Sequence, residues 1–306
     1  MLKTNDKLVT VRVPATSANC GPGFDCLGMA CTLYDTFTFE LIPEGYELEI
    51  EGEGEGRMHP SPNNLAFLAF LKLWEQVKHT ETGLKVHMKN DIPLSRGLGS
   101  SSAAIVGGLM AANYLSGKTM KPQELLNMAT AIEGHPDNVA PAILGGFTIS
   151  FMENGTAQAL RIVPARRYNL IAVIPDMPLS TAKARGAIPA VIPHKDAVFS
   201  ASRAALLVGA LMSGKSRLLP IAMEDKLHQP YRGPLIPGSF QAFAAAKKAG
   251  AYSAVISGSG STLLAVAHLQ ADGNKIGLAM QEALKKEGMD STVKLLKLDL
   301  RGAKIL

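Results

Sequence analysis

The chain has 306 residues, of which 47% are hydrophobic and 19% charged, and its formal net charge is +5. This length allows two domains with separate apolar cores, and the composition is that of an ordinary soluble globular protein. Lysines and arginines are scattered and aromatic residues make up only 6%, which argues against nucleic-acid binding. The sequence contains no secretory signal and no apolar run long enough to predict a membrane helix, so we expect a cytoplasmic protein.

The first half of the chain begins with alternating apolar and polar residues, which predict β-strands. One such stretch includes Val9, and others cover 36–41, 46–51 and 84–89. Helical spacing covers 61–79, with Ser61 as the expected N-cap. A second helix is predicted after Gly99, and because its residues are small or apolar on nearly every side, we expect it to be buried.

The second half mixes strand-like and helical stretches. Strands are predicted at 145–152, 157–164, 169–175 and 292–299, a strand–turn–strand at 253–267, and helices at 194–229, 239–249 and 272–287. This order predicts an α+β protein rather than a doubly wound parallel sheet. We place the domain boundary near residue 155, which divides the chain into domains 1–155 and 156–306.

Two glycine-rich stretches have features of a phosphate-binding loop. The stretch GALMSGKS (209–216) has the P-loop spelling, but a predicted helix precedes it and Pro220 follows closely. A P-loop needs a strand before it and a helix after it, so we interpret the match as a coincidence and Gly214 as a helix C-cap beside Lys215.

The stretch PLSRGLGSSSAA (93–104) has the expected surroundings, with a strand before it and a helix beginning near Ser100. Gly97 and Gly99 allow positive φ, and the first amides of the helix favour an anion. A tight turn capped by serines is the alternative, and this stretch alone does not decide between the two.

Three stretches together resemble the GHMP kinases. PLSRGLGSSSA matches the family signature P-x3-G-L-G-S-S-A with one extra serine, and 11–30 and 257–265 are similar to the N-terminal and C-terminal family motifs. The resemblance implies an ATP-dependent small-molecule kinase with two α+β domains. It also implies an N-terminal domain with a left-handed βαβ crossover, a C-terminal ferredoxin-like domain, a site between them and a homodimer.

Within that superfamily, the stretches 15–28, 133–146, 179–185 and 225–237 are most similar to homoserine kinases. This similarity implies that the protein phosphorylates L-homoserine with ATP and Mg²⁺ in threonine biosynthesis. L-Homoserine is a zwitterion with a primary alcohol, so its enzyme needs cations for the carboxylate and acceptors for the ammonium group. The alternatives are a GHMP kinase for mevalonate or a diphosphocytidyl-methylerythritol substrate, and a catalytically silent sensor.

The resemblance assigns substrate contacts to residues far apart in the sequence. Arg185 and Arg232 match the carboxylate-binding arginines, whose planar guanidinium groups suit a carboxylate. Asp25 and its neighbour Asn19 match the partners of the ammonium and hydroxyl groups. The remaining two substrate contacts are expected to be Asn138 and His135.

The same resemblance assigns the metal and nucleotide contacts. Glu133 and Ser101 match the Mg²⁺ ligands, although the extra serine leaves open which hydroxyl binds. Lys89 and Asn63, with Asn64, are expected near the nucleotide. The whole turn is expected to bind ATP: Pro93, Leu94, Ser95, Arg96, Gly97, Leu98, Gly99, Ser100, Ser101, Ser102 and Ala103.

Phosphoryl transfer depends chiefly on positioning and charge neutralisation. The resemblance implies that Asn138, Glu133 and Ser101 are the catalytic residues, with Asn138 holding the substrate hydroxyl. Asp137 is a candidate general base, but the resemblance to homoserine kinases favours a structural role for it and no dedicated base.

Overall fold

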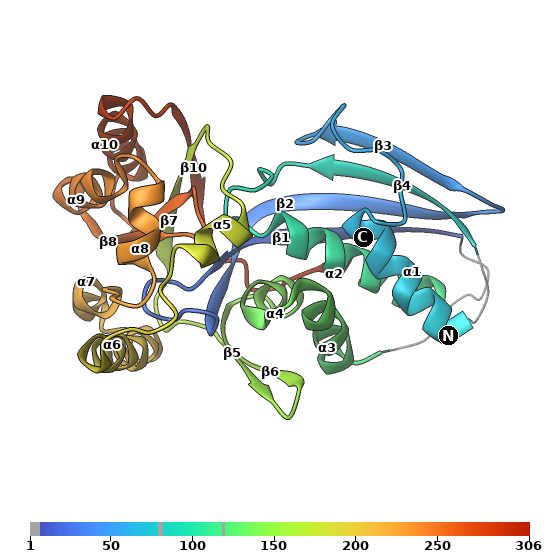
Figure 1. The fold of residues 1–306 in the computed structure, drawn as a ribbon, viewed down its shortest axis with the longest axis horizontal. Coiled ribbons are helices and arrows are strands. Elements are labelled where there is room, and N and C mark those ends of the chain that lie inside the picture. The colour runs from blue at the N-terminus through green and yellow to red at the C-terminus, as the bar shows by residue number, and fades with distance from the viewer. Residues whose placement is uncertain (1–6, 79–81, 118–119) are drawn as a thin grey trace.

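Two α+β domains lie side by side along the longest axis of the molecule, as Figure 1 shows for the computed structural model. One domain contains the larger sheet and comes mainly from the first half of the chain, and the other contains the smaller sheet. The structure describes residues 7–78, 82–117 and 120–306.

The alternating residues at the start of the chain form a long antiparallel pair of strands. β1 (Leu8–Ala18) runs beside β2 (Leu27–Ile42), with Val11 opposite Phe37. Both of these side chains are buried, so the period-two pattern places one face of the pair in the core.

The larger sheet has the strand order β11-β1-β2-β4-β3, with the β5–β6 hairpin attached to β2. Its parallel pair is β3 with β4, joined through α1. This is the βαβ unit that the family resemblance implies, and its left-handed crossover stays a prediction. The bounds are β3 Tyr46–Gly52, α1 Leu65–Lys78, β4 Gly83–Asn90, β5 Phe147–Glu153, β6 Thr156–Ile162 and β11 Lys304–Ile305.

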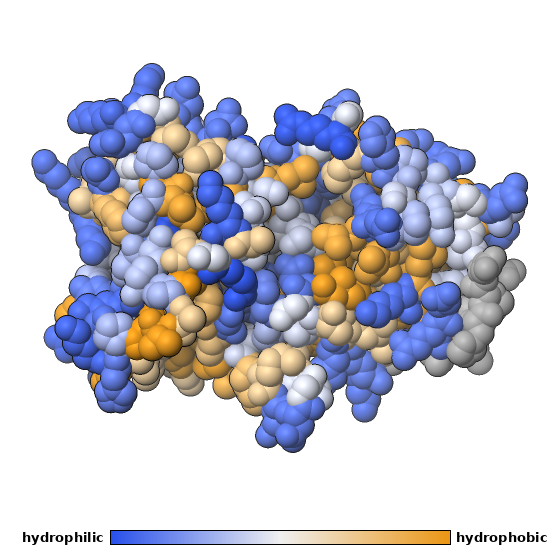
Figure 2. All heavy atoms as spheres, viewed as in Figure 1, coloured by the Kyte–Doolittle hydropathy of each residue, from blue (hydrophilic) through white to orange (hydrophobic). Residues whose placement is uncertain are grey.

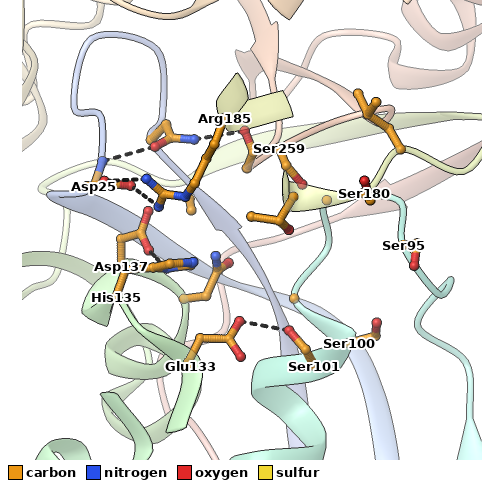
Figure 3. A pocket seen from close by; sticks show the side chains of 18 of the residues that line it. Asp25, Ser95, Ser100, Ser101, Glu133, His135, Asp137, Ser180, Arg185 and Ser259 are labelled. Carbon is orange, nitrogen blue, oxygen red and sulfur yellow. Dashed lines mark hydrogen bonds and ion pairs between the residues drawn. The ribbon is translucent and has the colours of Figure 1, made fainter. Parts of the chain in front are cut away.

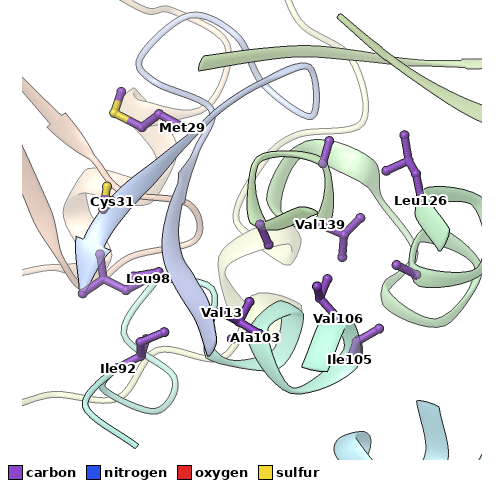
Figure 4. Packing of buried hydrophobic residues seen from close by; sticks show 14 of the residues in the cluster. Val13, Met29, Cys31, Ile92, Leu98, Ala103, Ile105, Val106, Leu126 and Val139 are labelled. Atoms are coloured by element: carbon purple, nitrogen blue, oxygen red, sulfur yellow. The ribbon is translucent and has the colours of Figure 1, made fainter. Parts of the chain in front are cut away.

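Four helices pack against one face of this sheet (Figure 1): α1, α2 (Ser100–Leu115), α3 (Pro122–Glu133) and α4 (Pro136–Leu144). As predicted, α2 is a buried helix. Figure 4 shows its apolar residues packed between β1 and the other helices. Its buried residues are Ser102, Ala103, Ile105, Val106, Gly107, Gly108, Leu109, Ala111 and Ala112.

The smaller sheet has the antiparallel order β10-β7-β9-β8, with α9 joining its first two strands in the chain and α10 its last two. This βαββαβ order, 4-1-3-2, is that of a ferredoxin-like domain, so the prediction for the second domain is confirmed. The bounds are β7 Tyr168–Pro175, α9 Ser239–Ala249, β8 Ala251–Ile256, β9 Leu263–His268, α10 Gly273–Lys286 and β10 Ser291–Leu296.

The predicted domain boundary near residue 155 does not separate the two sheets. It falls in the turn between β5 and β6, which pair along their whole length within the larger sheet. The chain enters the smaller sheet only at β7, and its C-terminal end returns to pair with β1. A glycine turn inside a hairpin has the composition of a linker, which is why the sequence suggested a boundary there.

The predicted helix 194–229 is also several elements. α6 (His194–Ser213) ends at Gly214, whose φ of +67° makes it the left-handed C-cap that we expected. A 3₁₀ turn and two short helices follow, α7 (Leu219–Ala222) and α8 (Gln229–Arg232). Because a helix precedes the GALMSGKS stretch, the P-loop spelling there is a coincidence, as predicted.

The structure also differs from the sequence prediction in the start of α1 and in several helices that were not predicted. α1 begins at Leu65, and Asn64 caps it by accepting a hydrogen bond from the Ala66 amide (3.0 Å), so Ser61 is not the cap. Residue 79, the predicted end, lies outside the described residues. The sequence did not predict α3, α4 or the short α5 (Thr181–Gly186).

One helix among the described residues, α6, is long and apolar enough to cross a membrane by length and composition alone. The sequence expectation concerned an uninterrupted apolar run, and α6 is not one, because charged residues interrupt it. A single helix of this kind is weak evidence for a membrane span, and Arg203 lies in its middle.

Close packing between α1 and α2 generates a stability prediction. A Cβ added to Gly108 would lie 2.3 Å from the Ala66 carbonyl oxygen, so Gly108→Ala forces the helices apart. We expect a loss of about 1–3 kcal/mol in the free energy of unfolding, measured by urea denaturation. Gly209→Ala on α6 is the control, because an added methyl group meets nothing within 4 Å there. Equal losses for the two variants would contradict the packing argument.

Candidate active site

The glycine-rich turn before α2 leaves the N-terminal end of that helix open. Gly97 and Gly99 both have a φ of +75°, and Gly99 stands at the N-cap, where it has no side chain to cap the helix. The first amides of a helix lack partners within it, and the dipole of this 16-residue helix favours negative charge at that end. The turn therefore offers the backbone donors that bind phosphate.

The second domain holds this turn in place. The Thr262 amide donates to the Arg96 carbonyl (3.0 Å), and the Ser257 hydroxyl donates to the Gly97 carbonyl (2.6 Å). A Cβ on Gly97 would lie 2.2 Å from the Ser257 carbonyl oxygen, so only glycine fits. The position of the turn is thus set by contacts between the domains.

Glu133 ends α3, and its carboxylate faces the first turn of α2 (Figure 3). Its Oε1 accepts hydrogen bonds from the hydroxyls of Ser101 (2.7 Å) and Ser102 (2.9 Å). Ser101 lines the cavity, whereas Ser102 is fully buried. A carboxylate and a hydroxyl are oxygen donors of the kind that suits Mg²⁺, and of the two hydroxyls bonded to Glu133 it is that of Ser101 that lines the cavity.

Asn138 lies in the first turn of α4 and lines the same cavity. Its Oδ1 accepts a hydrogen bond from the Thr16 hydroxyl (2.9 Å). This bond orients the side-chain amide and leaves its nitrogen as the group that can donate to a ligand.

The neighbouring Asp137 also lines this cavity, but its carboxylate is hydrogen-bonded to His135. It is 2% exposed, and its carboxylate accepts a hydrogen bond from Nδ1 of His135 at 2.6 Å (Figure 3). Burial by itself disfavours the charged imidazole, but the hydrogen bond with Asp137 raises the pKa of His135. The pair therefore holds the His135 ring at the wall of the cavity.

At the other end of the cavity, Asp25 and Arg185 form a bidentate ion pair (Figure 3). Nη1 and Nη2 of Arg185 lie 2.8 and 2.6 Å from the two carboxylate oxygens. Asp25 comes from the loop between β1 and β2, and Arg185 comes from α5. The hydrogen bond to Asp25 raises the pKa of Arg185, so this guanidinium is charged at every physiological pH.

Arg232, at the end of α8, brings a second guanidinium to the same place. It is 2% exposed and donates to the carbonyls of Ala184 (3.1 Å) and Gly258 (3.1 Å). Its guanidinium and that of Arg185 both lie over the ring of Phe24, 5.0 and 5.4 Å from the centroid. Burial, together with Arg185, lowers the pKa of Arg232 to about 10, which leaves it protonated at neutral pH.

Asn19 lines the cavity, but both ends of its amide are occupied. Nδ2 donates to the Gly258 carbonyl (2.8 Å), and Oδ1 accepts from the Asp25 amide (3.1 Å). Asn19 therefore braces the loop that carries Asp25, and its direct contact with substrate stays a prediction.

Two adjoining cavities meet at the glycine-rich turn before α2, the phosphate turn. The first, of about 210 Å³, contains Asp25, Arg185, Arg232, Asn138 and Glu133. The second, of about 550 Å³, lies beside it and shares Ser95, Ser100 and Ser101 with it. Figure 2 shows the hollow between the domains, with an apolar surface on the side of α1 and α2.

The second cavity is more apolar than the first. Phe37 and Met88 line it, and so do Asn63 and Asn64, for which the sequence predicted nucleotide contacts. Lys89 was also predicted there, but it is exposed and lines neither cavity. Successive residues of a strand point to opposite faces, so the neighbour of Met88 on β4 faces away.

Other residues of the predicted ATP turn serve its structure. Pro93, Leu98 and Ala103 are buried. The Arg96 side chain donates to the Pro175 carbonyl (3.0 Å) and faces the second domain rather than the first cavity.

Sequence reasoning missed several residues of the site. Thr16, Ser180, Thr181 and Ser259 lie at or beside the first cavity, and Asp35 and Asn90 line the second. Thr16 lies inside a motif that the sequence had already singled out. Asn90 follows Lys89 on the same strand, so the period-two pattern could have identified it in place of that lysine.

Family comparison agrees with this geometry. The GHMP kinases N terminal domain matches residues 64–146, and the GHMP kinases C terminal domain matches residues 201–286. The crystal structure of L. major mevalonate kinase in complex with R-mevalonate is 16% identical with a TM-score of 0.70, covering 98% of this chain and 97% of that one. At that identity the likeness concerns the fold alone.

Homoserine kinases are much more similar. That of Carboxydothermus hydrogenoformans is 43% identical over 296 residues, covering 97% of this chain and 96% of the relative. That of Moorella thermoacetica is 45% identical over 284 residues, covering 93% and 95%. The crystal structure of homoserine kinase from Cytophaga hutchinsonii is 28% identical with a TM-score of 0.89, covering 100% and 99%. The chain therefore belongs to the homoserine kinase family of GHMP kinases.

Proposed function

We propose that this protein transfers the γ-phosphoryl group of ATP to the hydroxyl of L-homoserine. The observation that carries the proposal is that Asp25, Arg185 and Arg232 lie in one cavity with the phosphate turn. A zwitterionic head group needs both signs of charge, and a hydroxyl on its side chain can then reach toward the turn.

The charged groups suit each part of the amino acid. Arg232 and Arg185 provide guanidinium donors for the α-carboxylate. Asp25 is already bound to Arg185, but each carboxylate oxygen can accept more than one hydrogen bond, so it can also accept from the α-ammonium.

The nucleotide fits across the two cavities. The apolar cavity lined by Phe37 and Met88 suits a planar base. Ser100 and Ser101 line both cavities, so a triphosphate passing over the start of α2 leads from the base to the substrate.

Glu133 and Ser101 fit Mg²⁺ as ligands, with nucleotide oxygens and water completing the shell. Among the described residues no group of three or more His, Cys, Asp and Glu side chains is placed to hold a metal, which agrees with an ion shared with the nucleotide. When bound, Mg²⁺ neutralises charge on the β- and γ-phosphates.

The proton of the substrate hydroxyl has a route that needs no side-chain base. Asn138, oriented by Thr16, donates its amide to the hydroxyl oxygen and cannot accept the proton. Asp137 is buried against His135. The hydroxyl oxygen therefore attacks the γ-phosphorus, the bond from phosphorus to the oxygen of ADP breaks, and the proton passes to an oxygen of the transferred phosphoryl group.

A cytoplasmic location stays a prediction from the sequence, and a homodimer and a place in threonine biosynthesis stay predictions from the family resemblance.

A substrate panel tests the proposal. We expect ADP release with L-homoserine but not with mevalonate or galactose, measured in a coupled assay with Mg-ATP. 3-Aminopropan-1-ol lacks only the carboxylate of homoserine and 4-hydroxybutyrate lacks only the ammonium, and we expect each to lower kcat/KM by at least about 100-fold. Turnover of mevalonate, or of no compound in the panel, would contradict the assignment.

The absence of a base predicts a contrast between two neighbours. Asp137→Asn keeps the hydrogen-bonding shape beside His135, so we expect kcat within about tenfold of the wild type. Asn138→Ala removes the donor to the hydroxyl, and we expect kcat to fall by about 100-fold or more. Complete loss of turnover in the Asp137 variant with unchanged substrate binding would instead identify Asp137 as the base.

The two serines beside Glu133 can be separated by their metal dependence. If Ser101 is the ligand, Ser101→Ala raises the Mg²⁺ concentration for half-maximal rate by about tenfold or more. Ser102→Ala is the matched control, since it removes the other hydroxyl on the same carboxylate oxygen, and it should change this concentration by less than about threefold. A larger increase in this Mg²⁺ concentration for Ser102→Ala than for Ser101→Ala would identify Ser102 as the ligand instead.

A further inference from the structure

The loop that carries Phe24 and Asp25 has an unfavourable backbone. Asn19, Cys20 and Asp25 have φ values of +67°, +50° and +56°, in the left-handed region that residues other than glycine rarely adopt. Such conformations persist only where surrounding contacts impose them. The loop therefore needs an anchor, and Asn19 supplies only part of it.

A second anchor is a histidine that the catalytic scheme above does not use. His228 is fully buried, and its Nε2 lies 2.7 Å from the carbonyl oxygen of Gly21, in the middle of the loop. Its ring also packs on Phe24, with centroids 5.4 Å apart. The histidine thus holds the loop at its backbone and at one of its side chains.

The protonation state of this ring follows from its partners. A carbonyl oxygen only accepts, so Nε2 carries the proton and donates. Nδ1 is buried without a hydrogen-bond partner among the described residues, and a proton there would be unsatisfied. Burial lowers the pKa of His228 and outweighs the opposite effect of the Asp225 carboxylate, which lies 3.6 Å from Nε2, so the ring is a neutral donor.

The backbone of His228 is itself held rigidly. Asp225 accepts hydrogen bonds from the amides of Leu227 (2.8 Å), His228 (2.9 Å) and Gln229 (2.8 Å). The His228 carbonyl in turn accepts from the Arg232 amide (2.9 Å). One short turn therefore carries both the ring that holds the loop and a guanidinium of the site.

We propose that His228 is a positioning residue for the amino-acid substrate, because its bond to Gly21 sets the places of Phe24 and Asp25 relative to Arg185 and Arg232. The proposal rests on the proposed function for the identity of the substrate. His228 lines neither of the two cavities and contacts the loop at the head-group end of the site, so its loss is expected to affect the substrate end more than the nucleotide end.

Two substitutions of His228 by amide side chains of different length test this positioning role. The side chain of His228→Gln places a donor near the position of Nε2, whereas that of His228→Asn is one methylene shorter and falls short of Gly21. We expect the Asn variant to raise KM for L-homoserine by about 10–100-fold, as for a buried hydrogen bond lost, with KM for ATP within about twofold. The Gln variant should recover most of the loss. Should the Asn variant not fold, His228→Phe keeps the aromatic packing without the donor and replaces it.

Amide hydrogen exchange supplies a measurement that needs no substrate. In the Asn variant we expect faster exchange in residues 19–26 and unchanged exchange in 97–103. Equal rises in KM for both substrates, a Gln variant no better than the Asn variant, or unchanged exchange in the loop would overturn the proposal. If the wild type does not phosphorylate homoserine, the proposed function fails, and exchange in the two segments still decides whether His228 anchors the loop.

Discussion

The ion pair between Asp25 and Arg185 joins the two domains at the place where the site lies, and the arrangement of the site depends on it. Its side chains are 36% and 37% exposed, so the pair adds only about 0–1 kcal/mol to stability. Its importance is geometric, because two parallel hydrogen bonds set both the distance and the orientation of the groups. The loop after β1 and the helix α5 are thereby held in register across the cavity.

The phosphate turn is also held by contacts between the domains, because backbone groups of the turn form hydrogen bonds with the second domain. Because the Arg96 carbonyl accepts from the Thr262 amide, any movement of the second domain also moves the turn. Gly258 joins the two ends of the site, since its carbonyl accepts from Asn19 and from Arg232. Substrate groups and phosphate donors are therefore placed by one connected set of hydrogen bonds, which suits a reaction that depends mainly on positioning.

Motifs predicted the site better than periodicity predicted the fold. Asp25 and Arg185 are 160 residues apart, yet each lies in a motif whose residues contact the site, so their meeting was foreseeable. The break between the domains was not, because the turn Asn154–Gly155 is the same whether it ends a domain or a hairpin. Pairing of β11 with β1 was equally hidden, since a two-residue strand is too short to show a period. Lys89 shows a different limit of the sequence. The alternation of residues along β4 was visible, but the sequence did not say which of the two faces of the strand turns toward the cavity.

Under the proposed function, selectivity for a zwitterion follows from how Asp25, Arg185 and Arg232 are paired before a ligand binds. Asp25 is already paired with Arg185, whereas the buried Arg232 guanidinium donates to two carbonyl groups and lies over an aromatic face. A carboxylate ligand places an anion beside Arg232, and it also brings a second carboxylate close to Asp25. Like charges at that distance repel strongly in a partly desolvated site. An α-ammonium between the two carboxylates removes this repulsion, so a zwitterion satisfies every charge while a simple hydroxy acid does not.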